Sequence, residues 1–343
     1  MRKHIRIYLL NLVVICLLAA CEQGQHSGAP FVISGPTMGT AYTIKINELE
    51  DRYNGQKIRK DINDILERIN NSMSTYIDSS ELSKINQSPQ TEWIRVSDDL
   101  LTVIEQALAV SKLTGGAFDI TVGPIVNLWG FGPGPRRDDI PNDDQINLVL
   151  QNVGYQLLQT RQEPPSIKKS RTDLYIDLSG IAKGYAVDKL AEYLEGIGIN
   201  NYLVEIGGEL RAKGNNPEGA LWRIGIEKPV TGGRFLQRVI ELDNKSMATS
   251  GDYRNYIENE GVRYSHTFDP NTGKPISHKL ASVTVIGSTS MFADALATGL
   301  MVLGQDKARE IAERENMAVL LIVKTDDGFT EIPSRAFGYH MME

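Results

Sequence analysis

Residues 177–184 combine a carboxylate, a small-residue turn and a lysine in the sequence Asp-Leu-Ser-Gly-Ile-Ala-Lys-Gly. An apolar, strand-like run over 174–178 leads into the turn, and a helical pattern follows over 181–194. A strand that ends in a tight turn and opens a helix presents free backbone N–H groups and the positive end of the helix dipole to anions. Lys183 adds a full positive charge there. The segment therefore predicts a phosphate-binding site.

A carboxylate and a hydroxyl lie one turn apart on a second predicted helix, over 291–303. Asp294 and Thr298 have the spacing i, i+4, so both oxygens face the same side. Oxygen ligands of this kind suit a hard cation such as Mg²⁺. The helix is otherwise apolar, and a buried carboxylate is costly unless it is paired or bound to metal. The alternative is that Thr298 bonds its own backbone and that Asp294 is solvated.

Four further motifs carry groups that could bind or react, and each also has a structural interpretation. The turn residues 35–40 come before the first strand that the alternation of residues 41–46 predicts. Tyr76 could stack on a planar ring or pack in the core. Asp119 could bind a ligand or cap a turn. His266 could act as a general base, bind a metal, or hydrogen-bond within its Asp-Pro-x-x-Gly turn.

The remaining pattern predicts an α+β fold in one compact body, with either one lobe or two. Helical patterns cover 58–69, 98–108, 181–194, 291–303 and 307–316. Strand-like runs cover 41–46, 174–178, 202–206, 221–226, 235–242, 281–286 and 318–323. The strands outnumber the helices and are only partly interleaved with them, which favours mixed sheets with flanking helices over a doubly wound parallel sheet.

The N-terminus has the features of a secretory signal. A basic start is followed by an apolar stretch and by Leu-Ala-Ala-Cys, which ends at Cys21. This ending resembles a bacterial lipobox, which implies cleavage before Cys21 and lipid attachment to its thiol; a plain signal peptide or an uncleaved anchor helix is the alternative. We expect residues 1–20 to be the signal and 21–34 to be the lipidated cysteine and a flexible tether.

Composition argues against cysteine-based sites and against a nucleic-acid partner. The other cysteine, Cys16, lies inside the signal, so the mature body would hold no disulfide, CxxC pair or Cys-ligated metal. Removal of the signal's three basic residues, Arg2, Lys3 and Arg6, takes the net charge from −7 to about −10. No basic run remains, so we expect no nucleic-acid partner.

Taken together, the motifs resemble one family. Their order and spacing are similar to the motif series of the ApbE family of FAD:protein FMN transferases, from about residue 35 to the C-terminus. The matching segments are Gly-Thr-Met-Gly-Thr around Met38, Met73–Tyr76, Ala117–Asp119, Asp177–Gly184, Val204–Glu209, Ala248–Asp252, His266–Pro270 and Asp294–Thr298.

The resemblance implies a function for residues 35–343 as an FAD-binding flavin transferase domain. It implies an FAD pocket formed by Met38, Tyr76, Ala117, Phe118, Asp119, Asp177, Lys183 and Phe268. It places Mg²⁺ between the backbone carbonyl of Gly180 and the side chains of Asp294 and Thr298, and it makes His266 the catalytic candidate, with Lys183 neutralising phosphate charge.

The implied reaction transfers FMN from FAD to a Thr or Ser hydroxyl of an acceptor protein and releases AMP. The resemblance also implies acceptors of the NqrC or RnfG kind, which are flavin-carrying subunits of redox complexes. It implies a lipoprotein that faces the periplasm, and Glu22 after the lipidated cysteine favours the outer membrane. Two other functions stay open: an FAD pyrophosphatase that produces FMN and AMP, and a non-catalytic FAD-binding lipoprotein.

Overall fold

The computed structural model describes residues 29–134, 139–230, 233, 235–252, 256–259 and 262–341. The predicted signal, Cys21 and residues 22–28 of the tether lie outside these ranges, and their assignments stay predictions. Residues 31–34, which we expected in the tether, belong to the first strand, β1 (Phe31–Thr37). No helix among the described residues is long and apolar enough to cross a membrane.

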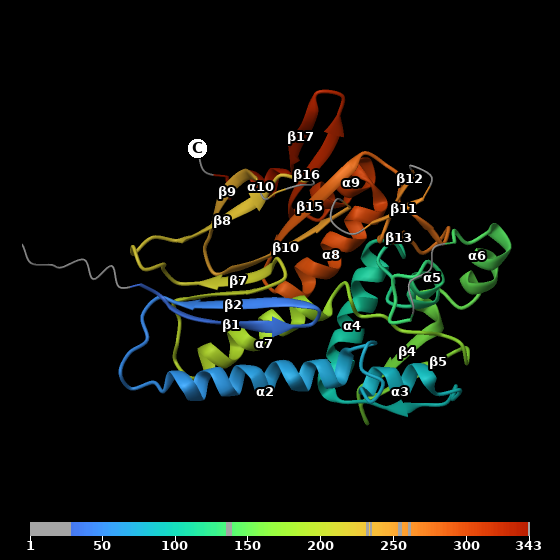
Figure 1. Cartoon of the computed structure of the whole chain (residues 1–343), viewed down its shortest axis with the longest axis horizontal. Coiled ribbons are helices and arrows are strands. Elements are labelled where there is room, and N and C mark those ends of the chain that lie inside the picture. The colour runs from blue at the N-terminus through green and yellow to red at the C-terminus, as the bar shows by residue number, and fades with distance from the viewer. Residues whose placement is uncertain are drawn as a thin grey trace, which may run out of the picture.

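An eight-stranded antiparallel sheet forms the centre of the molecule (Figure 1). Its strand order is β1-β2-β6-β7-β10-β15-β16-β17. After β1, its members are β2 (Thr40–Ile46), β6 (Tyr202–Ile206), β7 (Glu209–Lys213), β10 (Lys245–Gly251), β15 (Leu280–Gly287), β16 (Ala318–Thr325) and β17 (Gly328–Pro333).

Helices cover one face of this sheet, and a small sheet covers part of the other. Side chains alternate along the strands: Val319 and Leu321 of β16 pack with the helices, while Leu320 and Ile322 pack on the opposite face. The covering helices are α2 (Gly55–Met73), α4 (Asp98–Leu113), α7 (Ala182–Gly196), α8 (Ser290–Leu303) and α9 (Gln305–Arg314). The opposite face carries β8 (Trp222–Glu227), β9 (Leu236–Leu242) and α10 (Arg335–Gly338).

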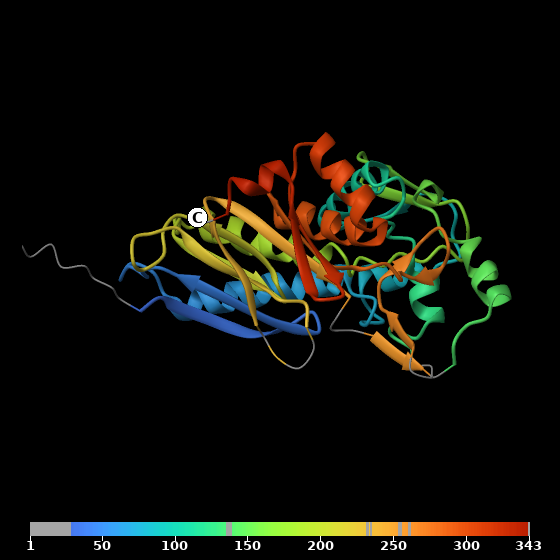
Figure 2. The ribbon, with the colours of Figure 1, turned by 90° about the horizontal axis from the view of Figure 1, so that it is seen from above.

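A smaller region with its own apolar cluster lies at the end of the molecule away from β1, as Figures 1 and 2 show. Trp129, Ile146 and Phe268 are buried in this cluster. It comprises α5 (Gly123–Leu128), α6 (Asp143–Leu150), β11 (Tyr256–Asn259), β12 (Val262–Ser265), β13 (Phe268–Asp269) and β14 (Lys274–Pro275). Nearby segments are α3 (Glu81–Gln87), β3 (Ile94–Arg95), η1 (Tyr155–Leu157), β4 (Leu158–Arg161) and β5 (Ser166–Lys169).

The α+β class and most predicted elements are confirmed, but two assignments are wrong. Residues 174–178 are extended yet pair with no strand, because their backbone is satisfied elsewhere. Asn86 exchanges two hydrogen bonds with the backbone of Ile176, and the N–H of Asp177 donates to the carbonyl of Ile120. The residues 35–40 do not precede the first strand; they end β1 and form its turn into β2.

Candidate active site

Helices α7 and α8 cap one another where their N-terminal ends meet. The N–H of Gly184, in the first turn of α7, donates to Asp294 Oδ2 on α8 at 3.0 Å. In return, the N–H groups of Ser290 and Met291, which open α8, donate to Asp188 Oδ1 and Oδ2 on α7 at 2.9 and 2.8 Å. Each helix thus places a buried carboxylate at the positive end of the other.

Gly184 allows this crossing because a larger residue would not fit. A Cβ atom at this position would lie 2.3 Å from the carbonyl oxygen of Ser290 and 2.8 Å from the Cα of Met291. Both atoms belong to the α8 backbone, so no side-chain movement could relieve the contact. The glycine therefore sets how closely α7 approaches α8.

One lysine and two buried carboxylates form the charged cluster of the site. Lys183 Nζ lies 3.3 Å from Glu209 Oε1 and 3.8 Å from Asp294 Oδ2. Glu209 opens β7 directly after the Gly207–Gly208 turn, and Asp294 lies on α8. Lys183 was predicted in a phosphate-binding site and Asp294 in a cation site, and the two side chains lie together in the fold. No role in the site was predicted for Glu209, although it stands in one of the quoted motifs.

Burial and mutual attraction shift the protonation of all three groups. Burial raises the pKa of Glu209 to about 8, with Lys183 opposing and Asp294 adding to the increase. Burial also raises the pKa of Asp294, against the effects of Lys183 and the Gly184 N–H. Burial alone would lower the pKa of Lys183, but the charges of Asp294 and Glu209 outweigh it and raise the pKa above its usual value. Lys183 is therefore protonated at neutral pH.

Gly180 and Thr298 lie side by side next to this cluster. A Cβ atom on Gly180 would lie 3.4 Å from Thr298 Oγ1. The Thr298 hydroxyl is 3.1 Å from the Ser250 hydroxyl, so its recorded hydrogen bond leaves its own helix. Asp294 is buried and bonded to Gly184, which makes the solvated alternative wrong.

The Asp294 carboxylate, the Thr298 hydroxyl and the Gly180 carbonyl are oxygen ligands of the kind that a hard cation takes. Within the described ranges, no three His, Cys, Asp or Glu side chains form a group that could hold a metal ion. A cation here would depend on one carboxylate, a hydroxyl, a backbone carbonyl and oxygens of the substrate. Mg²⁺ is commonly held in this way, by one or two carboxylates plus substrate phosphates and water.

Two tight turns, one of which carries Met38, meet beside Lys183. Met38 and Gly39 have positive φ in the β1–β2 turn, and Gly207 and Gly208 have positive φ in the β6–β7 turn. A Cβ atom on Gly207 would lie 2.9 Å from Thr40 Cγ2 and 3.5 Å from Lys183 Cδ. The two turns and the lysine are therefore in contact, and half-buried Met38 lies beside them.

Asp177 and Asp119 both use backbone N–H groups to shape loops. Asp177 Oδ1 accepts from the N–H of Ser179, which tightens the turn before α7. Asp119 is buried; Oδ1 accepts from the N–H and hydroxyl of Thr121, and Oδ2 accepts from the N–H of Tyr155 at 2.7 Å. The turn-capping interpretation thus describes the contacts of Asp119, which joins two loops 36 residues apart.

Tyr76 is 65 % exposed, so the alternative that it packs in the core is wrong. Its hydroxyl donates to the carbonyl of Phe131 at 3.2 Å. Partial burial, and then the charge of Asp177, raise the pKa of the Tyr76 phenol. An exposed ring held by its hydroxyl beside Asp177 is available to a planar ligand.

Phe131, which the sequence analysis did not select, joins Tyr76 to the predicted residues of the smaller region. Its ring centroid is 6.4 Å from that of half-buried His266 and 5.6 Å from that of Phe268. Phe268 is buried and also packs on Trp129. Phe268 is therefore a core residue, and it packs against the Phe131 ring that lies next to His266. The sequence around Phe131 does not mark it as a site residue, because it stands in a loop rich in glycine and proline.

Ala117 and Phe118 are buried, and Phe118 packs beside Gly180 and α8. The Phe118 ring lies 3.2 Å from a Cβ atom built on Gly180, and its Cβ lies 2.9 Å from one built on Gly299 of α8. Asp252 pairs with Lys324 at 2.8 Å, so its recorded partner is this lysine. The predicted residues therefore fall into two groups: a charged group at α7 and α8, which we call the phosphate end, and an aromatic group at Tyr76 and His266, which we call the ring end.

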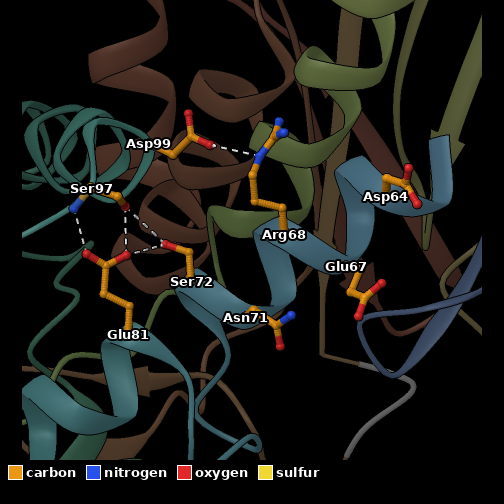
Figure 3. A pocket seen from close by; sticks show the side chains of 8 residues that line it. All are labelled: Asp64, Glu67, Arg68, Asn71, Ser72, Glu81, Ser97 and Asp99. Atoms are coloured by element: carbon orange, nitrogen blue, oxygen red, sulfur yellow. Dashed lines mark hydrogen bonds and ion pairs between the residues drawn. The ribbon is translucent and has the colours of Figure 1, made fainter. Parts of the chain in front are cut away.

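A separate surface hollow of about 500 Å³ lies between α2, α3 and the start of α4 (Figure 3). In it, Glu81 accepts hydrogen bonds from Ser72 and Ser97, and Arg68 pairs with Asp99. None of the predicted site residues lines this hollow.

Comparison with known proteins identifies the relatives of this chain. A family model described as "ApbE family" matches residues 38–321. The chain belongs to the ApbE family. It is 47 % identical over 332 residues to an FAD:protein FMN transferase of Vibrio cholerae, covering 97 % of this chain and 98 % of the relative. A Haemophilus influenzae protein of the same name is 48 % identical over 93 % of each chain.

Solved structures of the ApbE family share the fold. The flavin transferase ApbE from Vibrio cholerae superposes with a TM-score of 0.85 at 46 % identity, covering 91 % of this chain and 99 % of that chain. The ApbE protein from Thermotoga maritima superposes with a TM-score of 0.82 at 31 % identity, over 92 % and 100 %. Similarity at this level over nearly the whole length makes this chain, like its curated relatives, a transferase enzyme.

We expect Gly184→Ala to destabilise the protein by about 1–3 kcal/mol, because the added methyl group meets the α8 backbone. Helix propensity alone predicts the opposite sign, a gain of up to about 1 kcal/mol. Urea unfolding would measure the difference. Gly196→Ala is the matched control, since Gly196 is also in α7 and nothing lies within 4 Å of its Cβ position. Equal effects of the two substitutions would contradict the close crossing.

Proposed function

We propose that this chain transfers FMN from FAD to a Thr or Ser hydroxyl of an acceptor protein, with release of AMP, in a reaction that depends on Mg²⁺. The observation that carries the proposal is the Lys183–Asp294–Glu209 cluster at the N-terminus of α7, in a chain whose relatives are named FAD:protein FMN transferases. The cluster places a protonated lysine where a pyrophosphate can approach a helix N-terminus.

The reaction breaks the phosphoanhydride bond of the pyrophosphate and forms a phosphoester bond to the acceptor. The acceptor hydroxyl oxygen attacks the phosphorus of the FMN half, the bond from this phosphorus to the AMP phosphate oxygen breaks, and the hydroxyl proton passes to a base. Phosphoryl transfer of this kind depends mainly on positioning and charge neutralisation. Lys183, protonated and only partly exposed, would hold the pyrophosphate oxygens and stabilise the charge that develops on AMP.

Gly180, Asp294 and Thr298 are the residues that would hold the cation. When bound, Mg²⁺ acts as a Lewis acid on the pyrophosphate oxygens. Asp294 is already fixed by Gly184 and Lys183, so its carboxylate is oriented before a ligand arrives. Such preorganisation lowers the cost of binding.

The ring end of the site would bind the flavin and receive the acceptor. Tyr76 presents an exposed ring, and Met38 lies beside the turn that touches Lys183. His266 is half-buried near Phe131 and is the proposed base for the acceptor hydroxyl. An unactivated hydroxyl is a weak nucleophile, which is why a base at this position would accelerate transfer.

Anchoring and the acceptor belong to the same proposal. The lipobox-like ending at Cys21 supports a lipoprotein that faces the periplasm, and Glu22 favours the outer membrane. The proposed acceptors are flavin-carrying subunits of the NqrC or RnfG kind. FAD would then have to be available in that compartment.

In-gel flavin fluorescence tests the function directly. The full chain in detergent would be incubated with FAD, Mg²⁺ and an acceptor domain, and the acceptor would be analysed by gel and by mass. A labelled acceptor with the mass of FMN added, lost on chelation, supports the proposal. Free FMN and AMP without label would indicate a pyrophosphatase, and bound FAD with neither product would indicate a binding protein.

Asp294→Asn should reduce transfer at least roughly 100-fold, because the cation loses its one carboxylate ligand. Asparagine keeps an oxygen acceptor for the Gly184 N–H, so the fold should persist. Transfer rates across a Mg²⁺ titration and a thermal melt would separate the two effects. Asp306→Asn, an exposed carboxylate on α9, is the control. Full activity of Asp294→Asn in Mg²⁺ would refute the metal assignment.

His266→Ala should leave FAD affinity within about two-fold and slow FMN transfer by ~10²-fold or more. The expected reason is loss of the base for the acceptor hydroxyl, and the wild-type rate should depend on pH in a way that the variant's does not. Single-turnover labelling and FAD titration would measure the two quantities. A collapse of FAD affinity instead would place His266 in the binding pocket and remove it from catalysis.

Tyr76→Ala should weaken FAD binding by about 1–2 kcal/mol, roughly 5- to 30-fold, if the exposed ring stacks on a ring of FAD. Tyr76→Phe keeps the ring and loses only the hydrogen bond to Phe131, so it should retain most of the affinity. Calorimetry on both variants would distinguish stacking from loop positioning. Equal losses would indicate that the hydroxyl, and not the ring, carries the effect.

A further inference from the structure

Glu209 is buried at the phosphate end of the site, and nothing in the mechanism above uses it. It is 4 % exposed and follows the Gly207–Gly208 turn at the start of β7. Its Oε1 atom lies 3.3 Å from Lys183 Nζ. Its Oε2 atom is buried and has no hydrogen-bond partner in the part of the chain that the structure describes.

Such a carboxylate does not favour folding. A buried oxygen without a partner costs desolvation free energy that no contact returns. Burial also raises the pKa of Glu209 well above that of an ordinary glutamate, which shows that its charged form is disfavoured in this position. Buried ion pairs contribute little to stability, because the desolvation of their charges offsets their mutual attraction. Lys183 and Asp294 would remain such a pair.

One carboxylate alone would not hold the Lys183 ammonium group in place. Its side chain is long and flexible, and about a quarter of it is exposed, so its ammonium group has freedom to move. Asp294, the other carboxylate near it, is at 3.8 Å and already accepts from the Gly184 N–H. In the proposed function Asp294 also binds the cation. A carboxylate engaged by a cation holds the lysine less strongly, and Glu209 is then the group that keeps Lys183 in place.

We propose that Glu209 is a positioning residue that holds the Lys183 ammonium group at the N-terminus of α7 while Asp294 is engaged by the cation. Lys183, held in this way, binds the pyrophosphate of FAD. The inference rests on the proposed function and deepens it: Asp294 binds the cation, and Glu209 positions the lysine.

The test compares Glu209→Gln with wild type by the quenching of FAD fluorescence, with and without Mg²⁺, on the full chain in detergent. With Mg²⁺ present, the Kd for FAD should rise roughly 10-fold, because Lys183 loses the Oε1 contact that holds its ammonium group. Without Mg²⁺ the change should be smaller, within about three-fold, because Asp294 can then hold the lysine. The melting temperature should stay the same or rise.

Glu205→Gln is the matched control. Glu205 stands in the same β6–β7 hairpin and accepts from the N–H of Gly208, so the substitution removes the same charge from the same turn without touching Lys183. Its FAD affinity should equal that of wild type with and without Mg²⁺.

A double-mutant cycle with Lys183→Met provides a second measurement. If Glu209 acts through the lysine, Glu209→Gln should have no further effect on FAD affinity in the Lys183→Met background. A full, additive loss in that background would overturn the proposal.

The remaining outcomes are separable. Unchanged FAD affinity in Glu209→Gln, with FAD bound normally by wild type, would overturn the inference and leave the proposed function intact. A lower melting temperature with unchanged affinity would make Glu209 a structural residue and also overturn it. Wild type that binds no FAD would overturn the proposed function and this inference together.

Discussion

The reciprocal capping of α7 and α8 is the interaction on which the site depends. Asp188 and Asp294 are buried carboxylates that accept from the first-turn N–H groups of the opposite helix. Buried carboxylates are tolerated when they are hydrogen-bonded, and a helix N-terminus supplies both donors and a favourable dipole. Gly184 lets the backbones approach closely enough for these bonds. One crossing therefore fixes the positions of Lys183, which opens α7, and of Asp294, which lies on α8.

The central sheet supplies the rest of the site through its turns. The β1–β2 turn carries Met38, and the β6–β7 turn carries Glu209 to Lys183. Because β2 and β6 are antiparallel neighbours, their turns lie at the same end of the sheet, where Gly207 contacts Thr40. Thr40 and Gly207, about 170 positions apart in sequence, thus meet beside the same lysine through strand register. The ring end is built differently, from loops of the smaller region that Phe131 connects to Tyr76.

Much of this arrangement could be predicted from the sequence, because local patterns encode it. Apolar periodicity identified α7 and α8, and the spacing of Asp294 and Thr298 placed both on one helix face. The strand assigned to 174–178 failed because an extended apolar run does not reveal its partner, which here is the side chain of Asn86. The contacts of Asp188 and Glu209 could not be predicted either, since their partners lie 102 and 26 residues away and meet them only in the folded protein.

The balance of charge in the cluster supports the proposal that a cation binds together with the pyrophosphate. Lys183 is protonated, Asp294 opposes it, and Glu209 adds negative charge to the extent that its raised pKa allows. The cluster therefore has no net positive charge, although it stands where a doubly charged pyrophosphate would bind. The α7 dipole contributes only about half a unit charge, and Asp294 already faces it. A divalent cation bound by Asp294 reverses this balance. The lysine, freed from Asp294 and held by Glu209, can then pair with phosphate oxygens, so cation and FAD should each strengthen the binding of the other.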